Sequence, residues 1–198
     1  MLSGLDYQCK DLPPEKIVAV HGSIGKASCE SCGAPVNFDD FCDEVKCCIK
    51  DIYGQDEAAP KKSNPIVCKC CNKPAVKPST VLFGASLPTS FFDLSEDDTK
   101  SADLLIVAGT SLVVSPANFL VQMVPLTSMR VIVNTDPVGQ HLGVQYGSES
   151  KRDFFAQAPC DEVFLQLIVH LGWTADLKNV LDELPEQSLS LVTSRIEC

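Results

Sequence analysis

Residues 103–111, Asp-Leu-Leu-Ile-Val-Ala-Gly-Thr-Ser, are a near-continuous apolar run that ends in a glycine and two hydroxyl residues. Such a short run of branched side chains is typical of a strand buried in a parallel sheet. Ser115-Pro116 then predicts a helix start, because serine favours the N-cap and proline the first turn. The helix carries an apolar stripe made of Ala117, Leu120, Val121 and Val124. A second buried strand at Arg130–Asn134 completes a strand, helix, strand unit, which predicts an α/β fold with a parallel sheet.

Polar or flexible residues follow three of the expected strands. His21 comes after the apolar run Lys16–Val20, Gly109–Ser111 after the strand at 103–108, and Asn134–Asp136 after the strand at 130–134. Open parallel sheets bind ligands at the carboxyl ends of their strands, so we expect these groups to converge on one edge. Taken one at a time, each also has an ordinary interpretation as a turn or surface residue.

Two Cys-x-x-Cys pairs, Cys29/Cys32 and Cys68/Cys71, indicate a zinc site. Four thiolates suit a tetrahedral structural ion, one per chain, and leave no open position on the metal for catalysis. The alternative is four small buried thiols. The composition of the second pair is left open by Cys70, which could replace Cys68 or Cys71 as a ligand. Only Cys68 and Cys71 have the x2 spacing.

The segment between the two pairs, residues 33–67, is longer than the roughly 15–20 residues that usually separate them. It contains a polar stretch at 55–64, which we expect to be an exposed insertion. We interpret Cys42, Cys47 and Cys48 there as loop or core thiols. A further short strand is predicted at Thr80–Gly84.

The net charge of −10 argues against nucleic acid as a partner, since phosphate binding requires clustered Lys and Arg. The chain has neither a signal-like start nor an apolar stretch of the roughly 18 residues that span a bilayer, which predicts a soluble intracellular protein without membrane contact. Eleven cysteines, an odd number, favour reduced thiols with zinc over a disulfide scaffold.

Near the carboxyl end, Cys160-Asp161-Glu162 precedes an amphipathic helical pattern that ends at Gly172-Trp173. Leu177–Leu184 predicts a further helical turn or two, and the last dozen residues are expected to form a loose tail. The acids Glu96, Asp97 and Asp98 are most simply a solvated helix start.

The order of these motifs resembles the sirtuins, NAD-dependent protein-lysine deacylases, and in particular their class I branch. The resemblance covers about Leu5 to Leu181 and depends on the whole ordered set rather than on one motif. That set is His21-Gly22-Ser23, the two cysteine pairs, Lys77-Pro78, Val81 to Pro88, Asp103 to Ser111, Val131 to Asn134, Cys160-Asp161 and Leu171-Gly172-Trp173.

The resemblance implies a partial Rossmann-like domain, 1–27 and 75–178, a zinc-binding module with an insertion, 28–74, and a C-terminal tail, 179–198. It implies that an acyl group passes from a substrate lysine to the ADP-ribose of NAD, with release of nicotinamide. His21 would be the general base on the ribose hydroxyls, because an imidazole accepts a proton near neutral pH. The substrates would be acyl-lysine proteins or peptides, in the cytoplasm or nucleus.

The same resemblance assigns further residues to NAD and to the peptide. Those that would line the adenosine half of NAD are Gly109, Thr110, Ser111, Asn134, Thr135, Asp136 and Cys160. Val81, Leu82, Phe83 and Gly84 match the strand that pairs with an extended acyl-lysine peptide, with Phe83 beside the lysine tunnel.

The chain also departs from the family pattern. A glycine-rich phosphate loop, a flexible cofactor loop and a Gln-Asn-Ile-Asp segment precede the histidine in the family, whereas here only 20 residues precede His21. We therefore expect an N-terminally truncated chain with little activity alone. Ala85 stands where an acidic residue is common. The alternative function is a catalytically dead zinc module that binds a protein partner.

Overall fold

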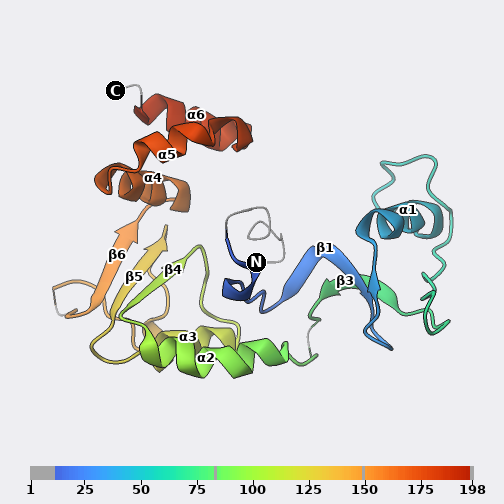
Figure 1. Cartoon of the computed structure of the whole chain (residues 1–198), viewed down its shortest axis with the longest axis horizontal. Helices are drawn as coiled ribbons and strands as arrows, with labels where there is room; N and C mark the ends of the chain where they lie inside the picture. Colours follow the sequence, from blue (N-terminus) through green and yellow to red (C-terminus); the bar gives the residue numbers. More distant parts are fainter. Residues whose placement is uncertain (1–11, 83, 149, 197–198) are drawn as a thin grey trace. The chain divides into compact units, whose positions relative to one another are not determined.

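A computed structural model describes residues 12–82, 84–148 and 150–196. The chain divides into two compact units, Met1–Asp93 and Leu94–Cys198, each with its own three-stranded sheet (Figure 1). The predicted domain limits at 27, 75 and 178 stay a prediction. Within the described ranges, every helix is too short or too polar to cross a membrane.

The first unit is built on an antiparallel sheet in the order β2-β1-β3. Its strands are β1 (Gly22–Cys29), β2 (Pro35–Val36) and β3 (Val76–Thr80), preceded by a 3-10 turn, η2 (Pro14–Lys16). Helix α1 (Phe38–Cys48) begins at Asn37, whose side chain accepts the backbone N–H of Asp40 at 3.0 Å. Ala27, Phe41 and Ile66 form a small core between this helix and the sheet.

Two strands predicted in this unit are wrong. Residues 17–20 form no strand, because a β-branched run needs a neighbour to pair with and the ladder with β3 begins only at Gly22, opposite Thr80. The strand predicted at 80–84 lies instead at 76–80. It includes Pro78, which is tolerated because β3 is an edge strand and Pro78 adjoins a register shift in β1.

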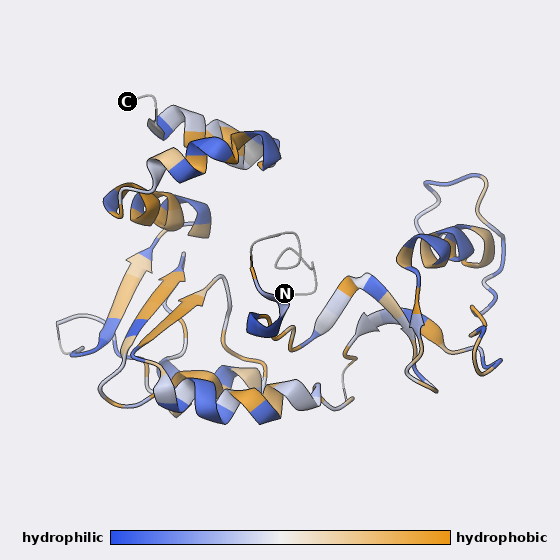
Figure 2. Cartoon of the chain, in the orientation of Figure 1, coloured by the Kyte–Doolittle hydropathy of each residue, from blue (hydrophilic) through white to orange (hydrophobic). Residues whose placement is uncertain are grey.

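The second unit confirms the α/β prediction. Strands β4 (Leu104–Ala108), β5 (Met129–Asn134) and β6 (Asp153–Gln157) form a parallel sheet in sequence order. Helical turns η3 (Ala117–Phe119) and α3 (Leu120–Met123) connect β4 to β5 where the helix was predicted. Figure 2 shows that the three strands are apolar along much of their length.

The two faces of this sheet differ. One face carries Val107 and Ile132, which pack with Leu112, Val121, Leu142 and Val144 into the core of the unit. The opposite face is also apolar. Val133 on this face is only 1% exposed, but Leu104 is 49% exposed, Ile106 42%, Met129 40% and Phe154 53%. One face therefore forms the core, and the other leaves an accessible apolar surface at these last four residues.

Helices complete both units. Helix α2 (Thr89–Ser101) precedes β4, and η4 (Gln140–Leu142) lies in the loop before β6. Helix α4 (Cys160–His170) is confirmed as predicted, with Gly172 in the left-handed region at φ +75°. The chain continues through α5 (Thr174–Asn179), η5 (Leu181–Glu183) and α6 (Glu186–Ile196).

The sequence interpretation missed α1 and β6 and was wrong at two further places. Glu96, Asp97 and Asp98 lie in the second half of α2 rather than at a helix start. The loose tail predicted for the last dozen residues is wrong for the described ones, since α6 packs against α4 and Leu191 lines a pocket with α4 residues.

Candidate functional site

The four predicted zinc ligands lie together in the first unit. The Sγ atoms of Cys29, Cys32, Cys68 and Cys71 all lie within 4.8 Å of one another. Cys29 Sγ is 3.6 Å from Cys71 Sγ, and Cys32 Sγ is 3.8 Å from Cys68 Sγ. A tetrahedron with metal–sulfur distances of about 2.3 Å has sulfur–sulfur edges of about 3.8 Å. The cluster therefore fits a structural zinc ion held by four thiolates.

The two cysteine pairs share one backbone geometry. In each, the N–H that follows the second cysteine donates to the carbonyl of the first: Gly33 to Cys29 at 2.8 Å and Asn72 to Cys68 at 2.9 Å. Both donor residues have positive φ, +72° and +58°, a conformation that glycine and asparagine adopt more readily than other residues. The positive φ explains why glycine and asparagine follow the two cysteine pairs. Each turn places the sulfurs of its two cysteines on the metal site.

The thiols influence one another's protonation. Backbone N–H groups of Cys71 and Cys70 lower the pKa of Cys68 to about 7. The N–H of Ala34 lowers the pKa of Cys32, but the neighbouring thiols and burial outweigh it and raise that pKa to about 12. Four close thiolates repel one another, and a divalent cation removes this cost when it binds.

Cys70 is exposed and lies outside the four-sulfur cluster. Its backbone N–H donates to the sulfur of Cys68 at 3.4 Å, so it supports a ligand without replacing one. This geometry favours Cys68 and Cys71 over Cys70 as the ligands of the second pair.

His21 lies in a turn just before β1 and is half-buried. The turn closes through a hydrogen bond from the Gly22 N–H to the Ala19 carbonyl at 2.9 Å. The His21 carbonyl accepts the N–H of Val81 at 3.0 Å, which extends the β1–β3 ladder past Thr80. The predicted base and the first residue of the predicted peptide segment therefore lie side by side.

The rest of the peptide segment is open. Leu82 is 56% exposed, Gly84 has φ +86°, and Phe83 lies outside the described residues. Val81 and Leu82 belong to no strand, so the backbone beyond the Val81 N–H has no neighbour in a sheet among the described residues.

The predicted adenosine residues meet at the carboxyl edge of the second sheet. Asn134 Nδ2 donates to the carbonyl of Thr110 at 2.9 Å and joins the end of β5 to the loop after β4. Asn134 Oδ1 accepts the N–H of Thr135 at 2.9 Å, and Thr135 Oγ1 donates to the Asp136 carboxylate at 3.0 Å. Thr110, Ser111, Thr135 and Asp136 are all exposed. Hydroxyls and a carboxylate at a strand edge suit a ribose, whose hydroxyl groups donate as well as accept.

Gly109 and Cys160 approach each other closely at this edge. Gly109 has φ +60°, and a Cβ added there would lie 3.4 Å from Cys160 Sγ. Cys160 begins α4, whose first turn contains Asp161 and Glu162. Their negative charges repel an anion that approaches the N-terminus of α4. This end of the site therefore suits an uncharged ring better than a phosphate.

Gln157 also lies at this edge, but the sequence did not predict it as a site residue. Gln157 ends β6, and its Nε2 donates to the Thr135 carbonyl at 3.1 Å. It was missed because β6 was missed. The signal that could have found it is the apolar triplet Phe154-Phe155-Ala156 between two polar residues.

Comparisons with known proteins identify the family. A family model described as "Sir2 family" matches residues 9–116. The chain is similar to "NAD-dependent protein deacetylase hst2" of Schizosaccharomyces pombe, with 31% identity over 94% of this chain and 51% of that protein. It is also similar to "NAD-dependent deacetylase sir2C" of Dictyostelium discoideum, with 33% identity over 86% of this chain and 37% of that protein.

A third relative is "NAD-dependent protein deacetylase HST2" of Candida albicans, with 33% identity over 84% of this chain and 44% of that protein. The match to the family model covers more than half of the chain, so the chain belongs to the Sir2 family. It spans about half, or less, of the length of these three relatives.

Proposed function

We propose that this chain is part of an NAD-dependent protein-lysine deacylase that transfers an acyl group from lysine to ADP-ribose and releases nicotinamide. The family membership and the printed names of the relatives support this reaction. The observation that carries it furthest is the carboxyl edge of the second sheet, where Gly109, Asn134 and Cys160, from three separate segments, come together.

His21 acts as the general base that accepts a proton from a ribose hydroxyl. Its support is the contact of its carbonyl with the Val81 N–H, which sets the base beside the segment that holds the acyl-lysine. Val81 to Gly84 pair with the extended peptide through backbone hydrogen bonds, and the open backbone after Val81 suits this role.

Residues at the sheet edge bind the adenosine half of NAD. Asn134 is held by the Thr110 carbonyl and orients the loop after β4, while Asp136 and Thr135 offer an acceptor and a hydroxyl to the ribose. The zinc ion takes no part in the reaction and holds the first unit together. The substrates are acyl-lysine proteins in the cytoplasm or nucleus.

The experiment is incubation of the zinc-loaded chain with NAD and an acetyl-lysine peptide, followed by mass spectrometry of nicotinamide and deacetylated peptide. The proposal expects both products in equal amounts, at a low rate, and their loss in His21→Ala. His141→Ala is the matched control, because His141 is an exposed residue of η4 that belongs to no candidate site. Products that form equally in the wild type and in His21→Ala would contradict the role of His21.

A further inference from the structure

A groove of about 170 Å³ lies on the first unit beside the second cysteine turn. Its apolar lining includes Val36, Ile66 and Val76, of which Ile66 is 6% exposed and the other two are half-buried. Ligand pockets for whole small molecules are usually about 300–1,000 Å³. The groove therefore has the size for one long side chain rather than for a cofactor.

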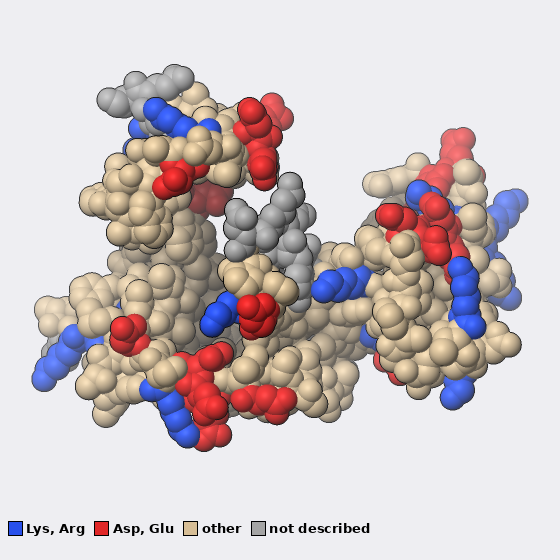
Figure 3. Space-filling model, viewed as in Figure 1, with Lys and Arg blue, Asp and Glu red and all other residues tan. Residues whose placement is uncertain are grey.

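Two carboxylates stand at its rim. Asp40 and Glu44 lie one turn apart on α1, and both line the groove. Figure 3 shows acidic side chains gathered over the part of the molecule that holds α1. Residues four apart on a helix are neighbours on its surface, so the two carboxylates can share one cation.

Lys69 already brings a cation to this position. Its Nζ lies 3.7 Å from Asp40 Oδ2 and 3.6 Å from Glu44 Oε1. Both distances exceed those of a hydrogen bond, so the carboxylate oxygens keep their acceptor positions for a better-placed donor. The Lys69 side chain is 76% exposed, and an exposed ion pair of this kind contributes little free energy. A competing cation can displace it.

We propose that this groove binds a lysine or arginine side chain from a basic segment of a partner protein. The aliphatic stem lies on Val36, Ile66 and Val76, and the cationic head replaces Lys69 between Asp40 and Glu44. Long basic side chains combine an apolar stem with a charged head, which matches an apolar floor with an acidic rim. Nucleic acid is excluded as the occupant, because its phosphates would meet two carboxylates.

The test measures binding of a fluorescein-labelled peptide, Lys-Gly-Leu-Lys-Gly-Leu-Lys, to the zinc-loaded full chain by anisotropy. An analogue with glutamate in place of lysine is the probe control. We expect saturable binding of the basic peptide only, with amide shifts in the ¹⁵N spectrum at α1 residues 38–48 and at residues 66–70. The double variant Asp40→Asn/Glu44→Gln should bind about tenfold more weakly, because both charge partners are gone.

Lys69→Gln gives the sharper prediction. Removal of the internal competitor should tighten binding by about threefold, whereas a purely structural role for Lys69 would leave it unchanged or weaken it. Asp39→Asn is the control for the carboxylate changes, since it removes one negative charge from the first turn of α1 at a residue that does not line the groove. Zinc content shows whether each variant keeps its fold, and where one does not, the amide shifts of the wild type decide.

Equal binding of the acidic analogue, amide shifts away from α1, or unchanged or weaker binding by Lys69→Gln would overturn the proposal. Neither NAD nor His21 takes part in the measurement. A negative result here therefore leaves the proposed deacylase function standing, and a chain without deacylase activity could still bind the peptide.

Discussion

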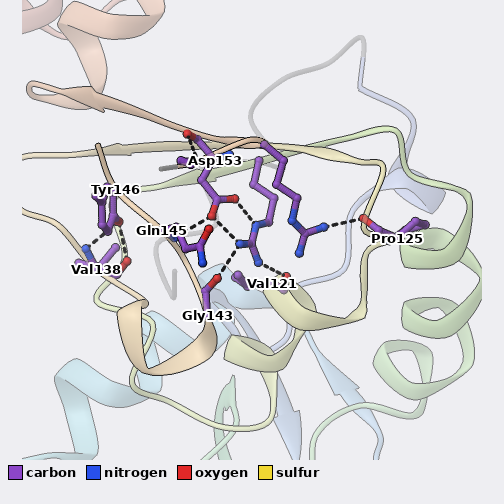
Figure 4. A network of polar contacts seen from close by, with 10 residues as sticks. Val121, Pro125, Val138, Gly143, Gln145, Tyr146 and Asp153 are labelled. Carbon is purple, nitrogen blue, oxygen red and sulfur yellow. Dashed lines mark hydrogen bonds and ion pairs between the residues drawn. The ribbon is translucent and has the colours of Figure 1, made fainter. Parts of the chain in front are cut away.

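Arg130 and Asp153 form a bidentate ion pair in which both side chains are only 2% exposed. Arg130 Nε lies 2.5 Å from Asp153 Oδ1 and Nη2 lies 2.6 Å from Oδ2. The remaining Arg130 donors reach the carbonyls of Val121 and Gly143 at 3.0 and 2.9 Å, and Asp153 also accepts the Gln145 N–H (Figure 4). The pair thus joins β5, β6, α3 and the loop between the two strands.

This pair sits on the same ladder as the candidate site. Arg130 is the register partner of Asp153, and Asn134, four residues along β5, is the partner of Gln157. The ion pair at the amino ends of β5 and β6 therefore stabilises the strand register. The same register places Asn134 beside Gln157 at the carboxyl ends.

Asp153→Asn should lower the free energy of unfolding of the second unit by about 3–5 kcal/mol, because it leaves a buried guanidinium without its charge partner. Chemical denaturation monitored by circular dichroism measures this. Asp176→Asn, the same change at an exposed position of α5, should stay within about 0.5 kcal/mol of the wild type. An Asp153→Asn variant as stable as the wild type would show that the pair is dispensable.

The pair also predicts a pH dependence. Burial raises the pKa of Asp153, but the hydrogen bonds from Arg130 and from the Gln145 N–H outweigh it and hold that pKa below the ordinary value of 3.8. Because the folded state lowers the pKa, its stabilisation is complete above the pKa of the unfolded chain and is lost as the pH falls through that of the folded chain. Denaturation series from pH 6 to pH 2 should show this loss, and Asp153→Asn should flatten it.

Zinc removal should unfold the first unit and spare the second, since the described core of the second unit consists of Val, Leu and Ile and contains no metal ligand. A strong chelator is expected to release about one zinc per chain and to abolish one of two thermal transitions. Cys68→Ser should reproduce the effect, whereas Cys70→Ser should keep the metal. Retention of zinc by Cys68→Ser, or its loss from Cys70→Ser, would contradict the assigned ligand set.

Gly22→Ala should disturb the turn that carries His21. Gly22 has φ +73°, and a Cβ there would lie 2.0 Å from the Ser79 carbonyl oxygen, so either the turn or β3 must move. We expect a loss of about 1–3 kcal/mol in the unfolding free energy of the first unit. Gly25→Ala in the same strand meets only the Ser23 hydroxyl at 3.5 Å and serves as the control. Equal melting temperatures for the two variants would argue against strain at Gly22.

Periodicity and spacing predicted those elements whose formation depends on residues close together in the sequence. Strands β4 and β5 are continuous branched runs buried on one face, and the cysteine pairs carry their spacing in the chain itself. The run at 17–20 is apolar and rich in branched side chains, as β4 is, but it pairs with no described strand, and composition does not reveal a partner.

Other features depend on tertiary contacts. Strand β6 is short and begins and ends with polar residues, Asp153 and Gln157, whose roles appear only when β5 lies beside it. Helix α6 was missed because its apolar residues, Leu189 and Val192 among them, are interspersed with serines and a threonine. Their role becomes clear only from the packing of α6 on α4. The choice of Cys68 over Cys70 likewise required the four sulfurs in space.

Binding of ADP-ribose by the zinc-loaded chain is the most direct test of the proposed NAD site. We expect saturable binding with amide shifts at Gly109, Asn134 and Gln157. Asn134→Ala should weaken it at least about tenfold, because the loop after β4 loses the hydrogen bond from Asn134 to the Thr110 carbonyl. Asn118→Ala is unsuitable as a control because Asn118 is buried, so exposed Asn179→Ala is used. Absence of these shifts at millimolar ADP-ribose, or equal affinity in Asn134→Ala and the wild type, would contradict the account.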